Sequence, residues 1–233
     1  MKKNATYRDH LKKMPDLQRR MTEKLLAETR PLRPVPSVFR QWLLWLVLAG
    51  LVSGLAVSIL RPQDGLWEKM LVLPNGSFLI LLFVGSALAA WNGIASSIPG
   101  EGPGPTAMTW MIAILAALVA IPFFFFTPDH LKAVLEHDMD TGFFCFRTVV
   151  LVAIPSWVIL AWMASRNASV RPGVSGLWLG ISAFLLGTGT VQIHCTHWET
   201  THVLLNHLLP LALFIAFPIW MGSFWLSVWE RKE

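Results

Sequence analysis

Side chains that bind soft metal ions are concentrated in the C-terminal third of the sequence, with one further cysteine upstream. The set comprises two cysteines and four histidines: Cys145, His194, Cys195, His197, His202 and His207. Five of the six lie within fourteen residues of one another. Thiolate and imidazole groups suit zinc, copper and other soft or borderline ions. The spacing matches no closed structural zinc motif, so a metal site made from these six residues is one hypothesis among several.

The two cysteines also allow other interpretations. If Cys145 and Cys195 face an oxidising compartment, they can form a disulfide, provided that their Cα atoms lie within about 7 Å. Alternatively both are small buried hydrophobes, and the histidines fill a polar interface. No paired carboxylate, nucleophile–base pair or glycine-rich phosphate loop accompanies them. The sequence therefore predicts a sensing or binding site rather than an enzyme.

The elements that position these residues are predicted to be membrane helices. Of the 233 residues, 54% are hydrophobic and only 14% are charged, whereas soluble domains carry about 25% charged residues. This excludes a disordered chain and a coiled coil, and it disfavours an ordinary soluble enzyme. A bilayer core of about 30 Å needs roughly 20 apolar residues of helix. Six stretches without Asp, Glu, Lys or Arg meet this approximately: 41–60, 78–98, 107–127, 148–165, 174–193 and 203–228. We expect an all-α, polytopic membrane protein with six transmembrane helices.

The distribution of charge predicts the orientation. The first forty residues carry eleven Lys or Arg against four acids, a net charge of +7, although the whole chain carries only +5. Because basic residues stay on the cytoplasmic side, we expect both the N-terminus and the C-terminus in the cytoplasm. Cys145, Cys195 and most histidines then face outward. The basic charge belongs to the tail, so direct nucleic-acid binding is not inferred.

Residues 1–40 form a separate cytoplasmic tail, and residues 41–233 form the membrane domain. Asp16 can cap a helix over about 16–29, and a proline-rich spacer over 31–36 follows it. The apolar stripe of this helix consists of Leu17, Met21, Leu25 and Leu26. The stripe has no core of its own to enter, so it docks either in the groove of a soluble partner or on anionic lipid.

Several segments resemble the NrsF family, which comprises six-span bacterial membrane proteins named as negative regulators of an extracytoplasmic-function sigma factor, sigma-F. The specific part is the cysteine–histidine segment Val191–His197 followed by His202–Pro210. The junction Leu25–Pro36 is also similar, as is Cys145 with Pro155 ten residues further on. The resemblance covers nearly the whole chain.

The resemblance implies a transmembrane anti-sigma factor in a bacterial inner membrane. Its cytoplasmic tail would hold the sigma factor away from RNA polymerase until stress releases it. Cys145 and Cys195 match the family's cysteines and would sense oxidants or heavy metals, with His194 and His197 beside them. No resident cofactor is required, although a heavy-metal ion could bind transiently. The alternative function is a small membrane redox protein that binds metal or haem through His194, His202 and His207. A transporter ranks third, because polar mid-membrane residues and inverted repeats are missing.

Overall fold

A computed structural model describes Arg20 and residues 35–72, 75–124, 139–167, 169, 171–197, 202–208 and 217–224. It divides the chain into two units, Met1–Val35 and Pro36–Glu233. In the first unit Arg20 is helical and exposed. The apolar stripe of the expected tail helix (Leu17, Met21, Leu25 and Leu26) lies outside the described residues. The division of the chain at residue 40 therefore stays a prediction.

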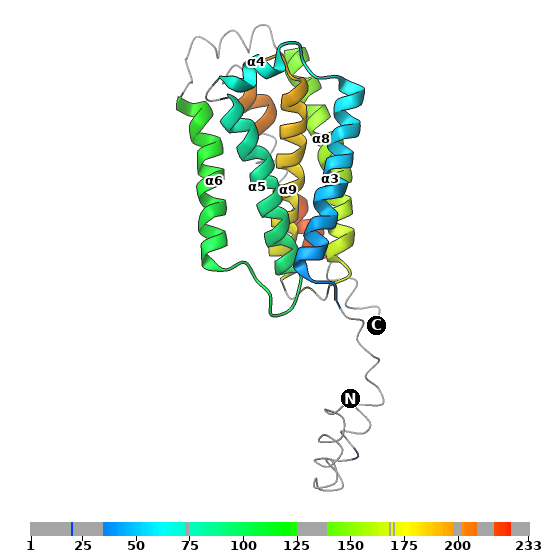
Figure 1. The fold of residues 1–233 in the computed structure, drawn as a ribbon. Coiled ribbons are helices and arrows are strands. Elements are labelled where there is room, and N and C mark those ends of the chain that lie inside the picture. Colours follow the sequence, from blue (N-terminus) through cyan, green and yellow to red (C-terminus); the bar gives the residue numbers. More distant parts are fainter. Residues whose placement is uncertain are drawn as a thin grey trace. The chain divides into compact units, whose positions relative to one another are not determined.

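The described part of the second unit is helical and contains no strand, which confirms the all-α class (Figure 1). Its elements are α3 (Val38–Leu60), α4 (Leu66–Leu71), α5 (Asn75–Ser96), α6 (Pro105–Phe124), α8 (Met139–Ala164), α9 (Pro172–His194) and the π-helix η1 (Val203–Leu208). Residues 217–224 are also helical. Four segments are long and apolar enough to cross a membrane: Val38–Leu60, Asn75–Ser96, Gly142–Ala164 and Pro172–His194. In α6 the apolar stretch Pro105–Leu118 is shorter. The count of six spans stays a prediction.

Two expected boundaries need correction. The fourth apolar helix begins at Met139, nine residues before the expected Thr148, because the helix continues through Arg147. The Arg147 side chain is exposed, and its guanidinium lies 5.9 Å from the centre of the Phe144 ring. A long charged side chain can leave an apolar helix surface in this way without ending the helix. The expected loop over 61–77 also contains the short helix α4.

Helix α9 lies at the centre of the helices that carry the site. It packs mainly against α5 on one side and α8 on the other (Figure 1). In their most apolar windows, 89% of the residues of α9 are buried, compared with 11% in α3. Helix α3 therefore presents most of its apolar surface outward, where a bilayer would solvate it, whereas α9 is surrounded by protein.

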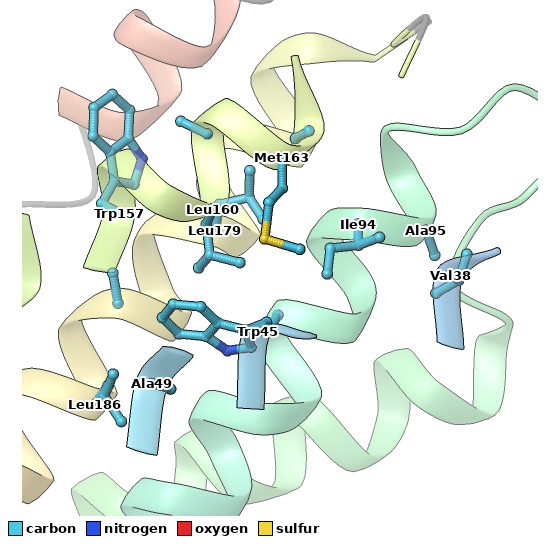
Figure 2. Close-up of a cluster of buried hydrophobic side chains, with 14 residues drawn as sticks. Val38, Trp45, Ala49, Ile94, Ala95, Trp157, Leu160, Met163, Leu179 and Leu186 are labelled. Atoms are coloured by element: carbon cyan, nitrogen blue, oxygen red, sulfur yellow. The ribbon is translucent and has the colours of Figure 1, made fainter. Parts of the chain in front are cut away.

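One buried cluster joins four of these helices. Trp45 of α3 packs among Ile94 of α5, Leu160 of α8 and Leu179 of α9, and all four side chains are almost completely buried (Figure 2). Hydrogen bonds between α5 and α9 accompany this apolar packing. The hydroxyls of Ser86 and Ser182 each donate to the other residue's backbone carbonyl across α5 and α9, both at 2.8 Å.

Small residues let α9 approach its neighbours closely. A Cβ added at Gly187 would lie 2.8 Å from the Val149 carbonyl oxygen and 3.3 Å from the Ala153 amide nitrogen of α8. These are backbone atoms, which cannot move aside without displacing the helix. Helix α8 bears Cys145, and Cys195 directly follows α9. The close packing of these two helices therefore depends on the absence of a side chain at Gly187.

We expect Gly187→Ala to lower stability and Gly54→Ala to leave it unchanged or raise it. Overpacking at Gly187 costs about 1–3 kcal/mol, whereas a Cβ at Gly54 of α3 meets nothing within 4 Å. Alanine there gains about 0.5–1 kcal/mol of helix propensity. Thermal unfolding of both variants in the same detergent measures the difference. Equal melting temperatures would contradict the close α8–α9 contact.

Candidate thiol and histidine site

The structure brings Cys145 and Cys195 together from separate helices. Cys145 lies in the second turn of α8, and Cys195 is the residue that follows the last residue of α9. Both side chains are buried, and their sulfur atoms lie 3.8 Å apart. A disulfide bond is about 2.05 Å long, so the two residues are thiols in contact and not a disulfide. Fifty residues of sequence separate them, and the packing of α8 on α9 places them side by side.

Two histidines complete a buried group of four. The Cys195 sulfur lies 3.4 Å from Nε2 of His202, and the rings of His202 and His207 meet edge to face with centroids 5.2 Å apart. One ligand atom from each of Cys145, Cys195, His202 and His207 lies within 4.8 Å of the other three. Both ring nitrogens of His207 are buried and have no hydrogen-bond partner among the residues that the structure describes. Buried polar atoms are normally satisfied, so His207 faces a site that a ligand could fill.

The π-helix η1, which begins directly after His202 and contains His207, explains how the two histidines come together. In an α-helix, residues five apart point in directions about 140° apart, since each residue turns the chain by about 100°. In a π-helix the hydrogen bonds run between residues five apart, so such residues lie one turn above each other.

Asn206, which is not among the six candidate ligands, also supports the site. Its amide nitrogen lies 3.3 Å from Nδ1 of His202, on the opposite side of the ring from the Cys195 sulfur. The same amide group packs directly over Gly142 of α8, where an added Cβ would lie 2.5 Å from Oδ1. Gly142 therefore leaves the space that Asn206 occupies while it orients His202.

His194 and His197, the other two candidate ligands, lie outside the group of four. Nδ1 of His194 donates to the backbone carbonyl of Arg61 at 2.7 Å. The His197 ring stacks on His202 with centroids 5.2 Å apart, and its backbone carbonyl accepts a hydrogen bond from the Cys195 thiol at 3.3 Å. Both side chains are partly exposed. They flank the group of four rather than form part of it.

The segment after α3, including Lys69 of α4, is hydrogen-bonded to the C-terminal end of α9 beside Cys195. The Gln63 backbone N–H donates to the carbonyl of Ile193 at 3.2 Å. The Lys69 ammonium donates to the carbonyl of Thr196 at 3.1 Å and to Oε1 of Gln63 at 2.8 Å. Gln63 is buried. The sequence did not predict its contacts with α9, because a glutamine at this position is typical of an ordinary polar loop. We call these contacts the α3–α9 clamp.

The thiol of Cys195 is held in its protonated form. Its pKa lies above the ordinary value of 9.0. The largest cause is the hydrogen bond with Cys145, and burial acts in the same direction. His202 and His207 oppose both effects. Because folding raises this pKa, the folded protein holds the proton more tightly than the unfolded chain does. The resulting stability is fully present below pH 9.0 and is lost as the pH rises through the folded pKa.

Alkylation of Cys195 should therefore depend on pH in a way that Cys145 controls. Since the thiolate is the reactive form, we expect the reaction with iodoacetamide to reach its half-maximal rate above pH 9.0. In Cys145→Ala the largest cause of the shift is lost, so this midpoint should move to lower pH. Mass spectrometry of the Cys195 peptide gives rate against pH. A change in the maximal rate alone would indicate easier access, and an unmoved midpoint would contradict the role of Cys145.

Comparison with protein families gives one match that covers most of the chain. Residues 25–228 match the family NrsF, described as negative regulator of sigma F. The chain belongs to the NrsF family. No curated protein and no solved structure matches it. Membership implies a sigma factor as partner, and the family is one of regulators rather than enzymes. The NrsF match includes all six candidate ligands as well as Leu25 and Leu26 of the apolar stripe.

In this NrsF chain, a second polar cluster lies where α3 begins. The side chains of Gln41 and Asn167 exchange two hydrogen bonds, at 3.2 and 3.1 Å. Asn167 also donates to the Ser97 hydroxyl at 2.7 Å, and Gln41 donates to the Pro36 carbonyl at 2.9 Å. All three polar side chains are buried. The cluster fixes the backbone at Pro36, the first residue of the second unit.

Proposed function

We propose that this chain is a multi-pass anti-sigma factor of the bacterial inner membrane. It holds an extracytoplasmic-function sigma factor on its cytoplasmic tail. It releases that sigma factor when an outward-facing thiol and histidine site reacts with an oxidant or a heavy-metal ion. The observation that carries the proposal is the family match over residues 25–228, together with the buried group formed by Cys145, Cys195, His202 and His207.

The positions of the two polar clusters support a division between sensing and binding. The Gln41 cluster is at the start of α3, and the α3–α9 clamp follows its last residue. The 23 residues of α3 span about 34 Å at 1.5 Å per residue, which is close to the thickness of a bilayer core. If the basic tail lies in the cytoplasm, the thiols lie at the outer side.

The same helix offers a route by which a change at the thiols reaches the tail. A ligand or bond at Cys195 displaces the end of α9, and the clamp through Gln63 and Lys69 passes that displacement to α3. At its other end, α3 is bonded to Pro36 through Gln41. A stimulus shifts the equilibrium only by the difference in its affinity for the two states. A tenfold release of the sigma factor requires about 1.4 kcal/mol.

The experiment that tests this function is capture of the partner from the native host. Tagged full-length protein and a variant lacking Met1–Arg30 are purified in mild detergent, and the bound proteins are identified by mass spectrometry. We expect a sigma factor with the full-length protein and none with the truncated one. The variant Cys145→Ser with Cys195→Ser serves as a matched control and should retain the partner. Absence of a sigma factor from all three, with haem or a redox metal in the purified protein, would favour the redox alternative.

A further inference from the structure

Two distances within the group of four match the edges of a tetrahedral metal site, and all four donor atoms lie within 4.8 Å of one another. With Zn–S bonds of about 2.3 Å and Zn–N bonds of about 2.0–2.1 Å, a tetrahedron has S–S edges of about 3.8 Å and S–N edges of about 3.6 Å. The sulfur atoms of Cys145 and Cys195 are 3.8 Å apart, and the Cys195 sulfur is 3.4 Å from Nε2 of His202. The side chains therefore hold donor atoms near coordination positions.

Charge and burial favour the same kind of occupant. A divalent cation bound by two thiolates and two neutral imidazoles forms a complex without net charge, which can be buried without an unpaired ion. All four side chains are buried. Coordination would also satisfy one of the two ring nitrogens of His207, which have no hydrogen-bond partner within the described part of the chain. A hard cation such as Mg²⁺ prefers oxygen ligands, and the group of four supplies none.

We propose that Cys145, Cys195, His202 and His207 form a closed, four-coordinate site for one divalent cation of the zinc class, with Cd²⁺ as a competing ion. Binding forms two metal–sulfur and two metal–nitrogen bonds, releases the two thiol protons to solvent and transfers no electron. His194 and His197 are not ligands. The role of this ion in releasing a sigma factor rests on the proposed function, whereas binding itself does not.

Asn206 acts as a positioning residue in this site. A histidine that binds a metal usually donates its other ring N–H to an acceptor. When Nε2 of His202 binds the ion, Nδ1 carries the proton and needs that acceptor. The Asn206 amide lies 3.3 Å from Nδ1. Since the oxygen and nitrogen of an amide are interchangeable in such an assignment, a rotated Asn206 presents its oxygen to the Nδ1 proton.

The site also makes metal binding and disulfide formation exclude each other. Both use the sulfur atoms of Cys145 and Cys195, and a disulfide leaves no thiolate to bind the ion. Oxidation to the disulfide requires an oxidant that accepts two electrons, and it releases the same two thiol protons. A bound metal ion would also link α8, the C-terminal end of α9 and η1 to one another. The α3–α9 clamp contacts the same end of α9.

Cobalt provides the direct test, because Co²⁺ takes the same ligands as Zn²⁺ and is visible by absorption. We titrate reduced, metal-free, full-length protein in detergent with Co²⁺ and then displace it with Zn²⁺. We expect one ion per chain, intense ligand-field bands of tetrahedral cobalt and a thiolate-to-cobalt charge-transfer band. Weak octahedral bands without charge transfer would overturn the proposal. Retained binding after the thiols have been oxidised to a disulfide would also overturn it.

Variants then identify the ligands. His202→Gln and His207→Gln should each weaken Zn²⁺ binding by more than about a hundredfold, beyond the effect of losing an outer partner. The double variant His194→Gln with His197→Gln is the matched control and should bind as the wild type does. The reverse result would assign the site to the flanking histidines and overturn the proposal. Competition with a zinc chelator of known affinity measures each constant.

Gly142→Ala keeps all four ligands, so it tests the site even if a ligand variant fails to fold. The added Cβ displaces Asn206, and affinity should fall about tenfold to a hundredfold while the cobalt spectrum stays tetrahedral. Unchanged affinity would overturn the role of Asn206. Loss of the tetrahedral spectrum would mean that Asn206 is itself required for tetrahedral coordination. That result would overturn the assignment of the four ligands. Sigma-factor capture by the same preparations separates failure of this site from failure of the proposed function.

Discussion

Replacing Cys145 and Cys195 together by serine is expected to fix the protein in its repressing state. A hydroxyl neither forms a disulfide nor gives the thiolate that soft ions require, so the outer stimulus has no residue with which to react. A sigma-dependent reporter should then stay at its basal level under cadmium or oxidant stress, whereas the wild type is induced about tenfold or more if the coupling reaches about 1.4 kcal/mol. Reporter activity in the native host, with and without stress, measures this loss.

The design includes variants that separate sensing from folding. Basal repression by the double variant must equal that of the wild type, because an unfolded protein would release the sigma factor without stress. His194→Gln removes a histidine that contacts the Arg61 carbonyl rather than the thiols, and it should respond as the wild type does. If the double cysteine variant is induced as strongly as the wild type, the thiols are not the sensor.

Removing the apolar stripe of the tail should have the opposite phenotype, constant release. Burial of Leu17, Met21 and Leu25 in a partner groove contributes about 5–8 kcal/mol before ordering costs. Alanine at all three positions removes most of it. A loss of only 2.7 kcal/mol already weakens binding about a hundredfold. We expect the reporter to be active without stress and the sigma factor to be lost from the purified complex.

A charge variant distinguishes the partner groove from the lipid surface. Arg19, Arg20 and Lys24 lie off the stripe, and their replacement by glutamine keeps every apolar side chain. This variant should retain the sigma factor if the stripe docks in a protein groove. If the tail instead lies on anionic lipid, the charge variant should lose its affinity for vesicles that contain phosphatidylserine, and capture of the sigma factor should not depend on the stripe. That outcome would contradict the tail as the binding element.

The sequence predicted the helices well where membrane-length apolar runs determine them. The expected stretch 174–193 is observed as Pro172–His194, and 78–98 as Asn75–Ser96. Runs of about 20 apolar residues have little alternative to a helix, because every backbone polar group must be bonded. The prediction failed at Arg147, since a charged residue was treated as the end of a helix that in fact continues past it. It also missed α4, which is too short to give a periodic signal.

The site was less predictable, because tertiary packing selects its members. Six candidate ligands could be named from the sequence, but only the approach of α8 to α9 shows that Cys145 meets Cys195. His202 and His207 differ by five positions, a spacing that α-helical periodicity places on different faces. The contributions of Asn206 and Gln63 depend on neighbours that are 64 and 130 residues away in the sequence, Gly142 and Ile193. No local pattern carries such information.

The π-helix has a consequence for chain length. A turn closed by hydrogen bonds between residues five apart contains one residue more than an ordinary helical turn. The turn between His202 and His207 therefore contains one extra residue. Deleting Leu204 would convert the spacing of the two rings to four, which an ordinary helix again places on one face. The imidazoles would stay neighbours, while the residues of η1 after the deletion would rotate by about 100° relative to the residues before it. The extra residue thus sets which side of η1 faces its neighbours.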